Sequence, residues 1–313
     1  MKGRYYWNKR TGADLKTAIS YFNQAIDKDP GYALAYSGLA DAYGVLPSYG
    51  GDPSDFTPKA NAAAAKAMEL DPTLARPYAL LAANKYDTWD FSGGEAEFRK
   101  ALELDPSDAT AHQWFAEYLS NIGGRAQEAI DEANRAYQLD PLSPIISIAQ
   151  AQAYFLDRQF DKANEICRKI IADNPAFGRA HSMLAGLSWA QHKYPQAIQE
   201  WITGAQLEGD KNYAEVAAAT DAGFRSGGWP GAQRKAIEVS LARRKARTSY
   251  VSPYGIAGLY ADSGDKERAF EWLSTAYQEH DILLINLRTD ISFDSLRSDP
   301  RYAELVRKIG FPQ

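Results

Sequence analysis

Apolar residues recur along this chain in steps of four and three, and a proline follows each such run. Ala129, Ala133 and Ala136 precede Pro141, and small or aromatic triplets with the same steps precede the other prolines of the series. These steps place a triplet on one face of a helix, where small side chains let a neighbouring helix approach closely. Because proline lacks an N–H and disfavours helical geometry in the residue before it, each run predicts a helix that ends at its proline.

A second helical pattern begins after each proline, with steps of three, one and three. Tyr36, Leu39, Ala40 and Tyr43 show this pattern clearly, and it weakens towards residue 188. No sustained alternation of polar and apolar residues and no Asn-Gly or Asp-Gly hairpin signal accompanies it. The sequence therefore predicts an all-α fold built from units of helix, turn, helix and turn.

The units repeat with a nearly constant period. Spacings of 42, 34, 35 and 34 residues separate five prolines, and a sixth unit ends near Gly209, 34 residues further on. The unit is thus 34 residues long, and the first interval carries about eight extra residues. We assign these to a loop at residues 44–58, which is rich in Gly, Pro and Asp and should lie outside the stacked helices. The prolines are Pro30, Pro72, Pro106, Pro141 and Pro175.

These patterns resemble the tetratricopeptide repeat family, whose motif is W-x2-L-G-x2-Y…A-x3-F-x2-A…P over 34 residues. The match covers roughly residues 1–209 and returns at 250–281, with Tyr, His or Ser in place of the motif's Trp. The resemblance implies a right-handed superhelix of about eight helix pairs, in which the first helix of each pair lines an inner groove.

A looser resemblance covers the whole chain. The stretches "GRYYWNKRTGADLKTAISYF" (3–22), "YDTWDFSGGEAEFRKALELDP" (86–106), "AHQWFAEYL" (111–119), "YVSPYGIAGLYADSGDKERAFEWL" (250–273) and "FDSLRSDPRYAELVRKIGF" (293–311) are similar to the C-terminal repeat region of bacterial multidomain regulators. In those proteins such arrays follow a protein kinase, a winged-helix domain or a nucleotide cyclase. The resemblance implies an interaction or regulatory module fused to an effector domain in a full-length protein.

We expect one continuous solenoid whose character changes near residue 209. Residues 1–209 hold the six units in phase, and residues 210–313 hold a degenerate pair around "RSGGWPG" (225–231), an eighth pair and a C-terminal capping helix. Asp299, followed by Pro300, predicts the start of that last helix, and Gly310 its end. A cap is needed because the outermost repeat would otherwise leave apolar surface in water. The covering residues are Leu305, Val306 and Ile309.

Equivalent positions on the first helix of each pair predict the residues that a partner would contact. Some family members hold a peptide carboxylate there with Lys and Asn, and this chain lacks that pair. Because Asp41 and Glu117 would face inward, we expect a basic or neutral ligand, such as an extended peptide or a helix. The predicted groove residues are Ser37, Asp41, Arg76, Tyr86, Gln113, Glu117, Ile148, Gln152, Arg179, Ser182 and Trp189.

Charge and reactive residues add little to this picture. The net charge is −5 and the sequence pI is about 5.5, so no global field favours nucleic acid or anionic lipid. The single cysteine, Cys167, cannot form an intramolecular disulfide, and the four histidines are scattered. We predict no catalytic residue, no metal site and no cofactor, because no motif for them is present.

We therefore expect a non-enzymatic scaffold that binds a peptide or protein segment. Two alternatives remain: a regulatory or sensor module of a larger bacterial signalling or transcription protein, and an enzyme that uses the groove as its substrate site. The first residues, "MKGRYYWNKR", lack an apolar signal-peptide core, and no apolar run approaches about 18 residues. We expect a cytoplasmic protein without direct contact to nucleic acid or membrane.

Overall fold

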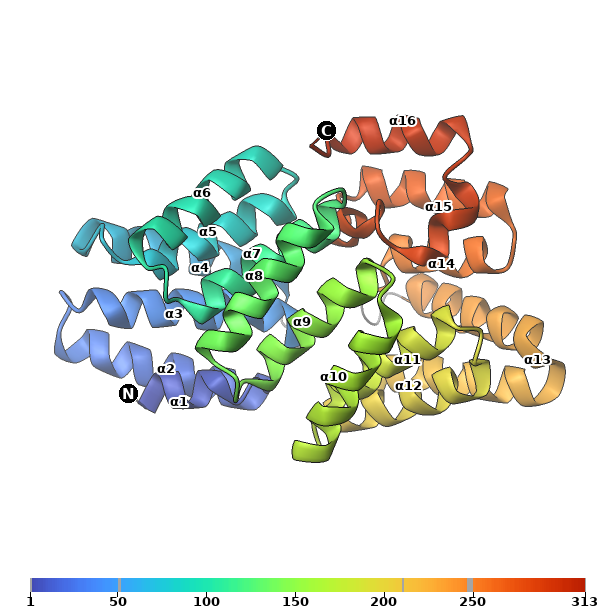
Figure 1. The fold of residues 1–313 in the computed structure, drawn as a ribbon, viewed down its shortest axis with the longest axis horizontal. Helices are drawn as coiled ribbons and strands as arrows, with labels where there is room; N and C mark the ends of the chain where they lie inside the picture. The colour runs from blue at the N-terminus through green and yellow to red at the C-terminus, as the bar shows by residue number, and fades with distance from the viewer. Residues whose placement is uncertain (1, 50–51, 210, 247–249, 313) are drawn as a thin grey trace. The chain divides into compact units, whose positions relative to one another are not determined.

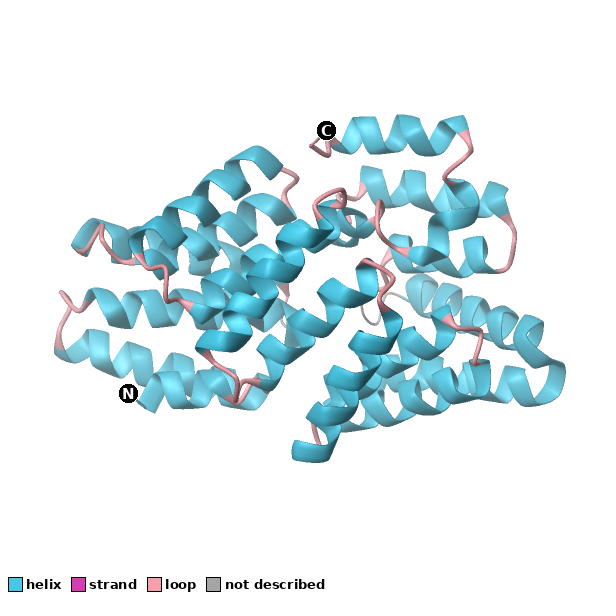
Figure 2. Ribbon diagram, viewed as in Figure 1, coloured by secondary structure: helices cyan, strands magenta, loops and turns pink. Residues whose placement is uncertain are grey.

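The computed structural model describes residues 2–49, 52–209, 211–246 and 250–312. Within these ranges the chain forms α-helices and short 3-10 helices joined by turns, and no strand (Figure 2). Helices that follow one another along the chain make the main contacts, as α1 with α2, α2 with α3 and α11 with α12 do. The prediction of an all-α solenoid is confirmed. The chain divides into two compact units, residues 1–115 and 116–313.

The first unit contains three complete helix pairs and the start of a fourth. Its repeated Asp-Pro phrase forms the turn between one pair and the next. In each case the aspartate side chain accepts a hydrogen bond from the backbone N–H two residues on, at 2.9–3.0 Å, as Asp29 does from Gly31 and Asp105 from Ser107. The helices are α1 (Lys2–Asn8), α2 (Gly12–Lys28), α3 (Ala33–Val45), η1 (Leu46–Tyr49), α4 (Pro53–Leu70), α5 (Ala75–Asp87), α6 (Phe91–Leu104) and α7 (Ala109–Ile122), which continues into the second unit.

The segment 44–58, expected as a loop, is mostly helical. Helix α3 continues through Val45, a 3-10 helix follows with Leu46 buried, and α4 begins at Pro53. Residues 50 and 51 lie outside the described residues. The difference has a physical reason: proline is favoured at the first helical position, where its missing N–H has no partner to lose. Pro53 therefore begins a helix rather than breaking one, and Pro58 lies inside the same helix.

The second unit continues the pairs and ends in a more irregular segment (Figure 1). It contains α8 (Ala126–Leu139), α9 (Pro144–Leu156), α10 (Phe160–Asp173), α11 (Gly178–Ala190), α12 (Tyr194–Glu208), α13 (Lys211–Ala246), α14 (Pro253–Asp262), α15 (Lys266–Gln278), η2 (Ile282–Asn286), η3 (Ile291–Leu296) and α16 (Pro300–Ile309).

Helix α13 is two helices that meet at a sharp reversal. Gly227 has φ −153° and ψ 21°, and Gly228 has φ 61° and ψ −156°. The second of these conformations is readily available only to glycine. Just outside the reversal the two halves come into backbone contact, because a Cβ added at Gly223 would lie 2.3 Å from the carbonyl oxygen of Gly231. The glycines of "RSGGWPG" thus serve a tight helix reversal.

The C-terminal capping helix has the ends that its sequence predicts. The side chain of Asp299 accepts from the backbone N–H of Arg301 at 3.0 Å, and Gly310 ends the helix with φ 83°. Leu305 and Ile309 are buried, and the Arg301 guanidinium lies 4.1 Å from the ring centroid of Phe270 on α15. Helix α16 therefore contacts α15 through Arg301, which also pairs with Glu267.

A partly buried carboxyl group lies at the end of α14, close to the segment that leads to this cap. Burial, and after it the negative charge of Asp290, raise the pKa of Asp262 to about 8, although a hydrogen bond with Ser292 opposes the shift. A carboxyl whose pKa is higher in the folded than in the unfolded chain stabilises the fold while it is protonated. That contribution is lost as the pH rises through the folded-state pKa.

We expect Gly186→Ala to raise the free energy of unfolding by about 0.5–1 kcal/mol, since alanine has the higher helix propensity. No atom lies within 4 Å of a Cβ added at this position in α11. Gly223→Ala is the matched comparison, and overpacking should lower stability there by about 1–3 kcal/mol. Urea denaturation of both variants measures the difference. Equal effects would contradict the backbone contact inside α13.

We expect Asp262→Asn to flatten the pH dependence of stability. In the native protein the free energy of unfolding should fall as the pH rises from about 4 to about 8 because of this group. The asparagine variant lacks that contribution, so its denaturation midpoint should change less over the window. Asp173→Asn, a change at an exposed aspartate of α10, is the control and should keep the native profile.

Candidate functional site

Charged side chains from several first helices meet in the unit of residues 1–115. Arg4 of α1 donates to Asp41 Oδ2 of α3 through Nη1 at 2.6 Å. Arg76 of α5 donates to the same oxygen at 3.3 Å and holds Asp108, just before α7, through two bonds of 2.7 Å. We call Arg4, Asp41, Arg76 and Asp108 the Arg–Asp cluster. Arg76 is its centre, because it bridges two carboxylates that are 67 positions apart in the sequence.

The carboxylates of the Arg–Asp cluster are deeper than its guanidinium groups. The side chains of Asp41 and Asp108 are 0% and 7% exposed, whereas those of Arg4 and Arg76 are 37% and 20% exposed. Oδ1 of Asp41 is buried and has no hydrogen-bond partner among the described residues. The partly exposed side chains of the cluster are therefore its two arginines, and both carboxylates lie beneath them.

The ring of Trp7 packs against the guanidinium groups of three arginines. The guanidinium carbon of Arg10 lies 3.6 Å from the ring centroid, that of Arg4 at 4.9 Å and that of Arg76 at 5.7 Å. Trp7 is only 3% exposed, so these cation–π contacts form in a largely dry setting, where they are strongest. The aromatic ring offsets part of the cost of placing three cations close together.

Local structure explains how the cluster is assembled. Asp108 begins α7 and accepts from the backbone N–H groups of Thr110 and Ala111 at 2.9 and 3.1 Å, which fixes its carboxylate. Helices α1 and α3 approach closely because Gly3 and Gly38 both lie against the ring of Phe22. This approach brings Arg4 within reach of Asp41.

Ionisation is strongly favoured within the Arg–Asp cluster. Burial alone raises the pKa of Asp108, but the charge and hydrogen bonds of Arg76, followed by the N–H groups of Ala111 and Thr110, outweigh burial and lower it below its usual value. Burial likewise lowers the pKa of Arg76, and the charges of Asp41 and Asp108 reverse this and raise it. The two groups therefore stabilise each other in their charged forms.

The predicted groove residues fall into two classes of exposure. The first class is buried, which limits contact with a partner: Ser37, Asp41, Tyr86 and Gln113 in the first unit and Ile148 in the second. The second class is partly exposed: Arg76 in the first unit and Glu117, Gln152, Arg179, Ser182 and Trp189 in the second. Asp41 and Arg76 are brought into contact. Gln152 instead bonds to Asn121, and Ser182 to Glu208, both at 3.1 Å.

One ground for expecting a basic or neutral ligand, the carboxylate of Asp41, is already paired in the Arg–Asp cluster. That expectation counted Asp41 as an inward-facing carboxylate, but Arg4 and Arg76 neutralise it below the surface. Sequence reasoning missed Arg4, Trp7 and Asp108. Asp108 was detectable as a helix N-cap three residues after Asp105. Arg4 and Trp7 were not, because the register of the short first helix cannot be read from the repeat.

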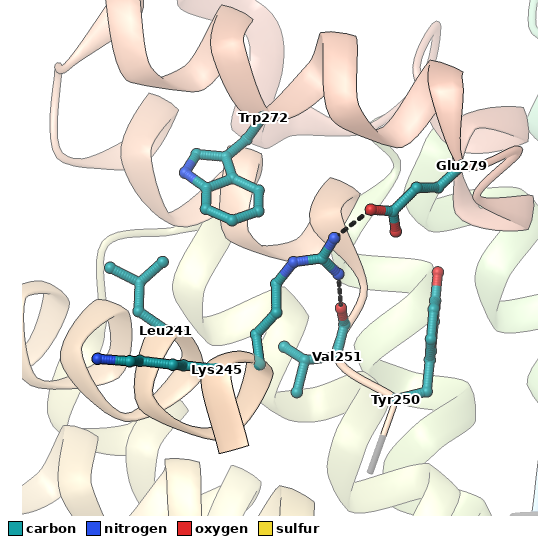
Figure 3. A pocket seen from close by; sticks show the side chains of 7 residues that line it. Leu241, Lys245, Tyr250, Val251, Trp272 and Glu279 are labelled. Carbon is teal, nitrogen blue, oxygen red and sulfur yellow. Dashed lines mark hydrogen bonds and ion pairs between the residues drawn. The ribbon is translucent and has the colours of Figure 1, made fainter. Parts of the chain in front are cut away.

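A pocket in the second unit lies between the end of α13, residues 250–251 and α15, with a volume of about 680 Å³ (Figure 3). Arg244 donates to the carbonyl of Val251 at 2.9 Å, pairs with Glu279 and lies 5.3 Å from the ring centroid of Trp272. The pocket's central cation is thus already paired. Arg244 ties α13 to α15. The other lining residues are Leu241, Lys245 and Tyr250.

Reactive groups are sparse in the described part of the chain. Cys167 is completely buried, and burial raises the pKa of its thiol to about 12, which disfavours the nucleophilic thiolate. Within the described ranges, no three His, Cys, Asp or Glu side chains are placed to hold a metal ion together. Among the described helices, none combines the length and apolar character that crossing a lipid bilayer requires.

Comparison with known proteins agrees with the repeat pattern. Residues 79–144, which run from α5 into α9, match the family model of the tetratricopeptide repeat. Over these residues the chain is similar to the tetratricopeptide repeat. Helices α5, α7 and α9 thereby become first helices of repeats, and α6 and α8 second helices. The buried alanines of α6 and α8, including Ala101 and Ala133, occupy the small-residue positions of the motif.

Individual relatives are distant. RNA polymerase II-associated protein 3 of Homo sapiens is 28% identical over 85 residues, which are 27% of this chain and 13% of that protein. The chain thus spans about an eighth of that curated relative. The human IFIT1 dimer with m7Gppp-AAAA is 16% identical over 86% of this chain and 68% of that chain, with a TM-score of 0.58. Yeast Tom70 is 18% identical over 95% and 63% of the two chains, with a TM-score of 0.48. At this identity the IFIT1 likeness shows a shared helical fold and nothing more.

We expect Arg76→Met to lower the free energy of unfolding by about 3–5 kcal/mol at neutral pH, because it leaves two buried carboxylates without their shared cation. Lys100→Met, which breaks an exposed ion pair with Glu103, should cost less than about 1 kcal/mol. The loss at Arg76 should shrink in acid, because the stability that comes from the lowered pKa of Asp108 is present above about pH 4 and is lost as the pH falls. Denaturant titrations at pH 3 and pH 7 test both points.

Proposed function

We propose that this chain is a non-catalytic scaffold, and that the guanidinium surface of the Arg–Asp cluster binds an acidic segment of a protein partner. Tetratricopeptide repeats support a role in protein–protein interaction in general. The specific proposal depends on one observation: the carboxylates of the cluster are buried and paired, while Arg4 and Arg76 reach the surface. A partner therefore meets positive charge.

The hydrogen-bonding capacity of Arg4 supports a carboxylate ligand. A guanidinium group carries five N–H donors in a planar fork that matches the two oxygens of a carboxylate. Of the donors of Arg4, Nη1 bonds to Asp41, and Nε and Nη2 have no described partner. A glutamate or aspartate side chain, or a chain-terminal carboxylate, could use that edge. The Trp7 ring behind it keeps the guanidinium plane in place.

The net charge of −5 limits how such a partner is recognised. Long-range attraction would favour basic partners, so an acidic segment must gain its affinity from short-range bonds at the cluster. Binding should therefore depend on the geometry of the arginine fork as well as on its charge. Replacing Arg4 by lysine keeps the charge and removes the fork, which separates the two contributions.

The remaining groove prediction belongs to the second unit. Arg179, Ser182 and Trp189 are partly exposed on α11, and open space adjoins Gly186 on the same helix. We propose these residues, together with Glu117 and Gln152, as further contacts for a protein segment. This proposal is compatible with a role as the regulatory part of a larger signalling or transcription protein that carries an effector domain on the same chain. In such a protein, binding of the partner segment would regulate the effector domain.

We expect the protein to bind a pool of acidic peptides, with Asp or Glu at every third position, more tightly than a matched pool in which Asn and Gln replace them. Arg4→Gln should weaken that binding about fivefold or more, since a charge-assisted bidentate contact is lost. Arg4→Lys should give an intermediate loss. Lys235→Gln, a change at an exposed cation of the second unit, is the matched control and should change affinity less than about twofold.

Fluorescence anisotropy at low and at physiological salt measures these affinities, with circular dichroism as the check on folding. Equal binding of the acidic and amide pools would refute the acidic-segment proposal. The IFIT1 structure contains m7Gppp-AAAA, so a capped AAAA oligonucleotide is included as a competitor. If that oligonucleotide binds more tightly than the acidic pool and depends on Arg4, the surface recognises RNA rather than protein.

A further inference from the structure

The segment after α15 turns back and touches helices that lie far earlier in the chain. The Thr289 hydroxyl donates to the backbone carbonyl of Asn121, at the end of α7, at 3.3 Å. Arg158, in the turn between α9 and α10, donates from Nη2 to both carboxylate oxygens of Asp294, at 3.1 and 2.8 Å. These pairs are 168 and 136 residues apart in sequence. We call residues 287–297 the strap.

Such contacts are unexpected in an open solenoid. In a repeat array each unit normally touches only its neighbours. Here helices α8 to α15 separate the end of α7 from the strap along the chain, yet the two are in contact. The strap therefore brings the C-terminal region of the second unit into contact with the beginning of that unit. It joins the C-terminal region to the α7–α8 and α9–α10 turns.

The strap is held firmly on its own side. Asp290 accepts from the Tyr254 hydroxyl of α14 at 2.8 Å, and the Tyr302 hydroxyl of α16 donates to the carbonyl of Leu287 at 2.7 Å. Phe293 and Leu296 are wholly buried. These contacts tie the strap to α14 and α16, so it moves with the C-terminal helices.

Its contacts with the earlier turns are weaker. The side chains of Arg158 and Asp294 are each 45% exposed, so water screens their attraction. The bond between Thr289 and Asn121 is long, at 3.3 Å. The strap should therefore separate from the two turns more readily than it separates from α14.

We propose that the strap is a releasable clasp that holds the second unit closed. When the clasp opens, the ends of α7 and α9 are freed while the strap stays on α14. The groove face is coupled to this event, because the side chain of Asn121 accepts from Gln152, one of the predicted groove residues, at 3.1 Å. A protein segment that forms a hydrogen bond with Gln152 therefore competes with Asn121, whose backbone carbonyl accepts from Thr289. This inference concerns residues 116–313 and is independent of the Arg–Asp cluster.

Two adjacent glycines provide a matched test. Gly123 and Gly124 both have positive φ, 71° and 81°, so alanine strains the backbone at either position. A Cβ added at Gly123 would lie 3.1 Å from Cγ2 of Thr289, whereas the nearest atom to a Cβ at Gly124 is 3.8 Å away, at the flexible end of Arg288. Only Gly123→Ala therefore pushes against the strap.

Hydrogen exchange measured by mass spectrometry follows peptides that cover residues 118–124 and 286–296. We expect Gly123→Ala to speed exchange in both peptides at least fivefold more than Gly124→Ala does. Adding Thr289→Ser to Gly123→Ala removes the clashing methyl group and keeps the hydroxyl donor, so exchange should return to the level of Gly124→Ala. Equal effects of the two single variants, or no rescue by serine, would overturn the clasp.

A second pair of variants keeps the test decisive if the glycine variants fold poorly. Asp294→Asn weakens the exposed pair with Arg158, and Glu238→Gln weakens an exposed pair within α13. We expect about twofold to fivefold faster exchange in the turn that contains Arg158 for Asp294→Asn, and no change there for Glu238→Gln. Exchange at that turn that is identical in both variants and the native protein would likewise overturn the proposal.

Discussion

Close contact between consecutive helices through small side chains is the constraint on which the other features depend. Ala67, Ala101 and Ala136 are wholly buried at equivalent positions of three second helices. A larger side chain at such a position would separate the helix from its neighbours, because close-packed interiors do not absorb added volume. Since short turns join the helices, the spacing within one pair determines where the next pair can lie.

The Arg–Asp cluster shows what this spacing permits. Its members lie on different helices, and the partners in each ion pair are 32 to 37 residues apart in sequence. They meet because first helices of successive pairs are adjacent. Burying charges in this way is expensive, and a well-packed apolar set would serve stability as well or better. The cluster therefore matters for geometry more than for stability. It fixes the relative positions of α1, α3 and α5 and leaves two arginine side chains partly exposed.

Repetition explains how much of the fold could be predicted. A triplet such as Ala129, Ala133 and Ala136 is weak evidence alone, but the same triplet at a 34-residue period fixes helices, turns and the order of pairing. The capping helix was equally readable, because Asp299 and Gly310 are local signals of helix ends. The helical segment at 44–58 was misread because Pro53 marks a helix start as well as a loop.

The candidate site was less accessible to sequence reasoning. A helical period identifies a face, but it does not show whether other residues cover that face, and Ser37, Gln113 and Ile148 proved to be buried. A helical period also says nothing about charge pairing. It therefore predicts that Asp41 contacts the ligand, although Arg4 and Arg76 form ion pairs with this residue. The contacts of the strap could not be predicted from the sequence, because nothing in a 34-residue period indicates that Arg158 contacts Asp294.

The reversal inside α13 has a topological consequence. Residues 211–246 double back only because Gly228 adopts a conformation that side-chain-bearing residues rarely adopt. Were this segment continuous, it would be a rod of roughly 54 Å. Its second half, with α14 to α16, would then be carried away from its own first half and left to find that surface on another molecule, which is the geometry of domain exchange. The backbone conformation of one glycine thus lets the second half of α13 pack on the first half of the same molecule.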